Sequence, residues 1–206
     1  MQLKMQTSLM LIIGTVVSLI GWMFIYPVTG GPDATAAENA AQLMADSDLG
    51  KVGMLMGFGG MGAVFIGFLN LSRKMASGGG AGAPYANISA ILALALVVMG
   101  VFTIGIEWAA ADASSAAEGT ALMQISLAGS TSFIMACGLL LVLFGIGIIL
   151  EKSFHIVIGG LAVLSGALFL IGNIDDGLAM TGFGGWILMM LVALALGVQT
   201  LRSSDN

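Results

Sequence analysis

Six apolar stretches, separated by short polar segments, most strongly constrain how this chain can fold. They cover approximately residues 8–27, 52–71, 88–110, 129–150, 156–174 and 182–201. An α-helix of about 20 apolar residues crosses a hydrocarbon core roughly 30 Å thick. Because lipid offers no partners for free backbone groups, a single spanning segment of this kind has to be helical. We therefore predict an all-α integral membrane protein with six transmembrane helices.

The composition predicts that residues 1–206 form a single membrane domain. The chain is 58% hydrophobic and 8% charged, whereas charged residues approach a quarter of a soluble globular domain. The segments between the apolar stretches leave no room for a soluble catalytic domain. A net charge of −5 argues against nucleic acid as a partner, because phosphates need clustered Lys and Arg. We expect a multi-pass protein of a lipid bilayer, namely a prokaryotic cytoplasmic membrane.

The charged residues sort between alternate gaps. Five of the six basic residues lie at the termini and in the second and fourth gaps: Lys4, Arg73, Lys74, Lys152 and Arg202. Nine of the eleven acidic residues lie in or beside the other three gaps: Asp33, Glu38, Asp46, Asp48, Glu107, Asp112, Glu118, Asp175 and Asp176. Short loops that carry Lys and Arg stay on the cytoplasmic side. Both termini are therefore predicted to be cytoplasmic.

A cleavable signal peptide is the alternative interpretation of the first stretch. Lys4 would be its charged region, residues 9–25 its apolar core and residues 34–36 a small-residue cleavage site. The distance between that core and the cleavage site is long. We therefore expect a retained helix.

Two loop segments carry helix signals. In the first outer loop, a helix is predicted over approximately residues 33–49, because four residues repeat at i, i+3, i+4 and i+7: Ala37, Ala40, Ala41 and Met44. This mostly alanine face is too weak to hold the helix in lipid, so we expect a lid over the bundle. Ser115 and Glu118 have capping-box spacing, so a helix begun there can continue into the fourth span.

The two halves of the chain show a faint likeness, which suggests a degenerate 3+3 inverted repeat. Residues 62–65 resemble 166–169, and residues 100–103 resemble 197–200. At one constant offset, four residues of the first span match four of the fourth: Thr7, Ser8, Gly14 and Gly21 with Thr131, Ser132, Gly138 and Gly145. Apolar segments drawn from few residue types also match by chance. A true repeat would indicate transporter-like ancestry, and both explanations stay open.

Glu107 is the sharpest candidate for an ion or proton site. A carboxylate at the centre of a span costs about 2.5–3.5 kcal/mol on insertion scales, so intramembrane acids are usually functional. Asp112, Asp175 and Asp176 are predicted on the same outer side, where the four acids would attract a cation. The alternative is that these acids only mark the outer side, with Glu107 as a structural residue near the interface.

No catalytic, cofactor or metal site is predicted. One histidine, His155, and one cysteine, Cys137, leave no nucleophilic triad and no bis-histidine haem. The chain has 15 methionines, and thioethers bind Cu(I), but methionine also fills irregular gaps in a core. We expect no cofactor.

Small residues recur at helical spacing on three predicted spans: Gly14, Ser18 and Gly21; Gly53, Gly57 and Gly60; and Ala193 with Gly197. Such faces let helices approach closely in lipid, either within this bundle or against partner subunits. We therefore expect a non-enzymatic accessory or structural subunit that binds other membrane subunits or self-associates. The alternatives are a small channel or carrier for a cation, proton or small solute and, third, a membrane enzyme.

Overall fold

The computed structural model describes residues 2–28, 34–174 and 176–202, and within these ranges the chain forms helices without strands. The elements in chain order are α1 (Gln2–Ile20), the π-helical turn η1 (Gly21–Ile25), α2 (Ala36–Ala45), α3 (Ser47–Ser77), α4 (Ala83–Ala111), α5 (Ala116–Glu151), α6 (Ile156–Gly172), the 3-10 turn η2 (Asp176–Leu178) and α7 (Ala179–Arg202). The prediction of an all-helical fold is confirmed.

Among the described residues, five helical segments are long and apolar enough to cross a membrane: Gln2–Ile25, Ser47–Ser77, Ala83–Ala111, Ala116–Glu151 and Met180–Arg202. The protein is therefore a multi-pass helical membrane protein, as predicted. The predicted stretch 156–174 forms the shorter helix α6, which has 17 residues and is about 26 Å long.

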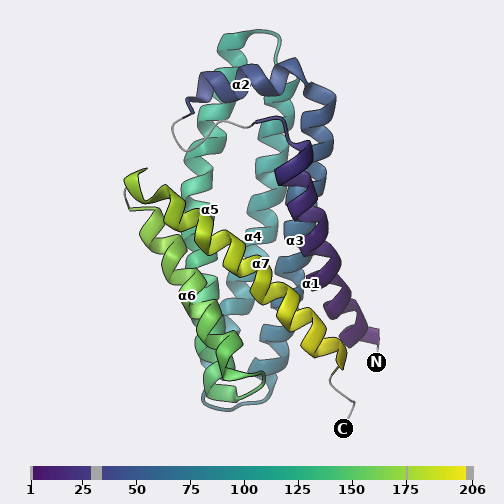
Figure 1. Ribbon diagram of the computed structural model, residues 1–206, viewed down its shortest axis with the longest axis vertical. Helices are drawn as coiled ribbons and strands as arrows, with labels where there is room; N and C mark the ends of the chain where they lie inside the picture. Colours follow the sequence, from purple (N-terminus) through teal and green to yellow (C-terminus); the bar gives the residue numbers. More distant parts are fainter. Residues whose placement is uncertain (1, 29–33, 175, 203–206) are drawn as a thin grey trace.

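The bundle has two chemically different ends. Helix α1 begins and α7 ends at the same end (Figure 1), here called the basic end, which carries Lys4, Arg73, Lys74, Lys152 and Arg202. At the opposite end, here called the acidic end, α2 lies across the ends of α3, α4 and α5 (Figure 1).

Helix α2 covers the acidic end as a lid, but with a different face from the predicted one. Ala37 and Ala41 are exposed, so the predicted alanine face is wrong at these two positions. Instead Ala40 and Leu43 are buried, in a cluster completed by residues of α3, α4 and α5. Leu43 supplies the large apolar side chain that the alanine stripe lacks. The predicted range 33–49 also extended too far, because Asp46 separates α2 from α3.

Several helices extend past the apolar stretches. Helix α3 begins at Ser47 rather than at residue 52, and α5 begins at Ala116 rather than at residue 129. The predicted helix start at Ser115 is confirmed, because its hydroxyl accepts a hydrogen bond from the Glu118 amide at 3.3 Å. The Glu118 carboxylate accepts from the Ser114 amide and hydroxyl rather than from the Ser115 amide that a full capping box would use.

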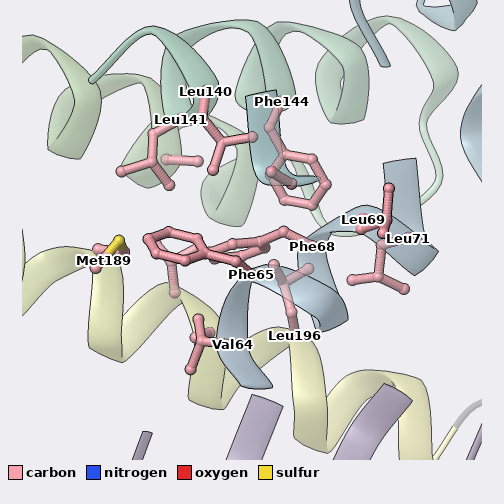
Figure 2. Close-up of a cluster of buried hydrophobic side chains, with 14 of the residues drawn as sticks. Val64, Phe65, Phe68, Leu69, Leu71, Leu140, Leu141, Phe144, Met189 and Leu196 are labelled. Atoms are coloured by element: carbon pink, nitrogen blue, oxygen red, sulfur yellow. The ribbon is translucent and has the colours of Figure 1, made fainter. Parts of the chain in front are cut away.

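Aromatic and aliphatic side chains close the middle of the bundle. Phe65 and Phe68 of α3 meet Phe144 of α5 and Met189 of α7 (Figure 2), and each of these side chains is at most 1% exposed. The rings of Phe68 and Phe144 have centroids 5.1 Å apart.

Paired glycines bring neighbouring helices into backbone contact. A Cβ built on Gly60 of α3 would lie 2.5 Å from the Gly14 carbonyl oxygen of α1. On the other side of the molecule, a Cβ built on Gly166 of α6 would lie 2.5 Å from the Gly138 carbonyl oxygen of α5. No side chain larger than hydrogen fits at these crossings, so glycine sets the α1–α3 and α5–α6 distances.

The glycine-rich segment between α3 and α4 is anchored, although its composition is that of a flexible linker. Glu151, at the end of α5, accepts a hydrogen bond from the Gly82 amide at 2.8 Å. A Cβ on Gly80 would lie 2.6 Å from both Glu151 carboxylate oxygens. Glu151 is one of two acids outside the charge alternation, and its contacts give it a role in holding this loop.

Candidate functional site

Glu107 is buried near the end of α4, with 7% of its surface exposed. One carboxylate oxygen accepts a hydrogen bond from the Tyr26 hydroxyl at 2.7 Å, and the other accepts one from the Ser126 hydroxyl at 2.7 Å. Tyr26 directly follows η1, and Ser126 belongs to α5. The Glu107 carboxylate therefore links α4, α5 and the residue that follows η1. The two hydroxyl donors offset part of the cost of burying the acid.

The turn η1 brings two aromatic side chains against α3. The Trp22 ring contacts Tyr26 and Phe58 edge to face, with centroids 4.8 and 4.7 Å away. Glycines of α3 make room for them: a Cβ on Gly57 would lie 2.5 Å from the Trp22 ring, and one on Gly53 would lie 2.7 Å from the Tyr26 Cα. A π-turn shifts the register of a helix, and here it precedes the residue that reaches Glu107.

Asp112 has a different partner from Glu107. It forms an ion pair with Lys51 of α3, and the Lys51 ammonium lies 5.5 Å from the centroid of the Trp108 ring. Lys51 is the basic residue that falls outside the charge alternation. The ion pair at the acidic end accounts for its position, because it compensates the Asp112 charge there.

Of the four predicted acids, Glu107 and Asp112 lie at the same end of α4. Asp175 lies outside the described residues, and Asp176 begins η2. The α6–α7 connection lies beside the middle of α5 (Figure 1), where the Asn173 amide donates to the Thr131 carbonyl oxygen at 3.3 Å. That point is about 22 Å along the α5 axis from Ala116. The cation site of four acids stays a prediction.

The small-residue faces of the first, second and sixth predicted spans lie against helices of the same chain. Gly14 and Ser18 contact Gly60, Gly21 contacts Gly57, and a Cβ on Gly197 would lie 2.7 Å from an Ile12 side-chain carbon. Ala193 is fully buried. Gly53 lies against Tyr26, as described above. These faces therefore hold α1 to α3 and α7, and they are not available to another protein.

Two other glycines of α3 face outward. A Cβ built on Gly59 or on Gly62 would meet nothing within 4 Å. Gly59 lines both an apolar groove of about 440 Å³ between α1 and α3 and one of about 290 Å³ between α3 and α4. The helical spacing that groups Gly53, Gly57 and Gly60 on one face of α3 leaves Gly59 and Gly62 outside that face.

A third apolar cavity, of about 560 Å³, lies between α5 and the α6–α7 connection. Its wall includes Phe133, Cys137 and Trp186, together with Met61 and Met189. Both methionines also belong to the closed core. The cavity therefore ends against that core.

No three His, Cys, Asp or Glu side chains gather as a potential metal site in the described ranges. The Glu107 carboxylate with its two hydroxyl donors and the groove lined by Gly59 and Gly62 are features with functional potential. No protein-family model, curated protein or solved structure matches the chain.

Proposed function

We propose that this protein is a non-enzymatic structural or accessory subunit of a membrane assembly. In this proposal a transmembrane helix of another subunit, or of a second copy, packs into the groove of about 290 Å³ between α3 and α4. Gly59 and Gly62 both line this groove. The observation that carries the proposal is a contrast within α3. Its inward glycines lie against α1, η1 or Tyr26, whereas a Cβ on Gly59 or Gly62 would meet nothing within 4 Å.

Packing physics favours a helix as the occupant of this groove. Lipid tails are as apolar as leucine, so helices associate in a bilayer mainly through close van der Waals contact. Small residues permit that contact because the two backbones can approach closely. The groove walls are apolar as well, including Met10, Phe58 and Ala63.

The closed interior supports a structural role rather than transport. Phe65, Phe68 and Phe144 fill the centre of the bundle, and both Glu107 oxygens are engaged by hydroxyl groups of the same chain. In this proposal, partner subunits therefore recognise the lipid-facing surface.

We further propose that α6 crosses the membrane as the sixth span, with both termini in the cytoplasm. The alternation of charges supports this topology, as does the start of α1 beside the end of α7 (Figure 1). The contacts between glycines also support an inverted 3+3 repeat. Each half packs its first two spans through two glycine pairs: Gly14–Gly60 and Gly21–Gly57, and Gly138–Gly166 and Gly145–Gly159.

The test of the subunit proposal is blue-native electrophoresis after mild solubilisation of the native membrane, with crosslinking as a second readout. We expect the wild-type chain in a species larger than a single chain. Gly59→Leu and Gly62→Leu should release it, because leucine fills the groove. Gly160→Leu on α6 is the matched control, since a Cβ there also meets nothing within 4 Å. A monodisperse single-chain species for the wild type refutes the proposal.

The second candidate is a proton or cation carrier, and the burial of Glu107 in an apolar helix favours it. The measurement is flux into proteoliposomes for the wild type and for Glu107→Gln. Flux that the substitution abolishes would support transport. Absence of flux in the wild type would remove this candidate.

A further inference from the structure

A polar cavity of about 380 Å³ lies at the basic end of the bundle, where four segments meet. These segments are the start of α1, the end of α3, the link between α5 and α6, and the end of α7. The polar side chains in its wall include Lys4, Thr7, Asn70, Lys74, Ser153 and Gln199. The volume falls within the range of small-ligand sites.

The wall of this cavity is cationic and rich in hydrogen-bonding groups. Lys4 and Lys74 contribute two positive charges, and the lining residues that the structure describes include no aspartate or glutamate. The Asn70 amide donates to the Thr7 hydroxyl oxygen at 3.2 Å, which ties α3 to α1 at the cavity wall. Two ammonium groups with hydroxyl and amide groups beside them match the oxygens of a phosphate.

Most of the described charges near this cavity are basic. Glu151 is the acid of the described basic end, and it lines a smaller adjoining cavity of about 160 Å³ together with Lys74. Its carboxylate is already engaged by the Gly82 amide. Arg73, Lys152 and Arg202 lie at the same end without lining the 380 Å³ cavity, and they add to the positive potential around it.

The position of the cavity near the ends of the helices fits a lipid headgroup. Its lysines lie at the start of α1 and in the last turn of α3, where the apolar part of each helix ends. Apolar side chains complete the wall: Leu3, Leu71 and Phe154. Basic cavities between transmembrane helices at the cytoplasmic interface are suited to anionic headgroups.

We propose that this cavity binds the phosphate of an anionic ligand, and that the ligand is the headgroup of an anionic phospholipid. Lys4 of α1 and Lys74 of α3 neutralise the phosphate charge. The Thr7–Asn70 pair and the Ser153 hydroxyl lie at the same wall as hydrogen-bonding groups for its oxygens. The bound lipid would then brace α1, α3 and α7 against one another.

The test uses the full-length protein in micelles and native mass spectrometry. Phosphatidylglycerol and phosphatidylcholine with the same acyl chains are titrated in one arm. Inorganic phosphate and glycerol phosphate are titrated in the other. We expect phosphatidylglycerol to bind more tightly than phosphatidylcholine. Lys4→Gln and Lys74→Gln should each weaken its binding about fivefold, and the double variant about 25-fold, from about 1 kcal/mol per interfacial charge.

Control variants separate the cavity from general surface charge. Arg73→Gln removes one charge beside Lys74 outside the cavity and should change the affinity less than twofold. Asn70→Leu keeps every charge and should still weaken binding, because it removes a polar group from the wall. Equal weakening by Arg73→Gln and Lys74→Gln overturns the proposal, as does unchanged binding in the double lysine variant. If inorganic phosphate and glycerol phosphate bind in a lysine-dependent way and phosphatidylglycerol does not, the lipid assignment is overturned.

Discussion

The contact between α1 and α3 predicts opposite effects of alanine at two adjacent glycines. A Cβ on Gly60 would lie 2.5 Å from the Gly14 carbonyl oxygen and 2.5 Å from the Ser18 amide nitrogen. Both are backbone atoms, so no side-chain rotation relieves the clash. A Cβ on Gly59 would meet nothing within 4 Å.

The size of the expected stability difference follows from these 2.5 Å distances. To restore a Cβ contact to about 3 Å, the two helices must separate locally by roughly 0.5 Å, and a gap of that size forfeits about a quarter of the dispersion energy of each contact it opens. Overpacking of a tight contact typically costs about 1–3 kcal/mol. The helix-propensity gain of alanine over glycine, up to about 1 kcal/mol, applies to both positions. The difference between the two variants therefore isolates the clash. We expect Gly60→Ala to be less stable than Gly59→Ala by about 1–3 kcal/mol.

Equilibrium unfolding in mixed micelles with increasing dodecyl sulfate measures this difference. Tryptophan fluorescence is a suitable signal, because Trp22 contacts Gly57 one turn away from Gly60. Circular dichroism of the folded variants should be unchanged, since both keep the helix. Equal unfolding midpoints for the two variants, or a higher midpoint for Gly60→Ala, would refute the glycine-contact reasoning.

Three further predictions concern the acidic end. Tyr26→Phe should lower the free energy of unfolding by about 1–3 kcal/mol, because it leaves one Glu107 oxygen buried without a donor; the same micelle titration measures it. Hydrogen bonds from the Thr35 amide and hydroxyl lower the pKa of Glu38, so their contribution to α2 is present above the ordinary glutamate pKa and is lost as pH falls through the lowered value. Hydrogen exchange of α2 amides should therefore speed up, relative to intrinsic rates, on acidification in the wild type and much less in Glu38→Gln. Leu43→Ala should weaken the docking of α2 by about 2–5 kcal/mol, and limited proteolysis of α2 should become faster without loss of the other helices.

Apolar periodicity predicted the helices and the lid well, since lipid and backbone chemistry permit few alternatives. It predicted helix ends poorly, because an apolar run marks where hydrocarbon lies and not where backbone hydrogen bonding stops. Ser47 begins a helix five residues before its apolar run, and the start of α5 at Ala116 was signalled by the capping residues Ser115 and Glu118 rather than by apolar residues. The face of α2 was misassigned for a related reason: Leu43 outweighs several alanines in buried area.

The partners of the candidate site could not be predicted. Glu107 was singled out as an acid in an apolar span, but the donor Tyr26 directly follows η1 and the donor Ser126 belongs to α5. Their placement depends on η1 and on the α4–α5 register, and neither leaves a periodic signal. In the same way, Lys51 was an exception to the charge pattern until its pairing with Asp112 gave it a role.

The length of α5 has a consequence for how the molecule sits in its membrane. Its 36 residues make a rod about 54 Å long, and even a tilt of about 40° leaves it a height of roughly 41 Å against a hydrocarbon thickness of about 30 Å. Some of the rod must therefore emerge into headgroups and water. Because the apolar stretch of α5 begins near residue 129, the part outside the hydrocarbon is the segment from Ala116 that packs against α2. Changes in bilayer thickness should alter how much of that segment is exposed to water rather than bend the bundle.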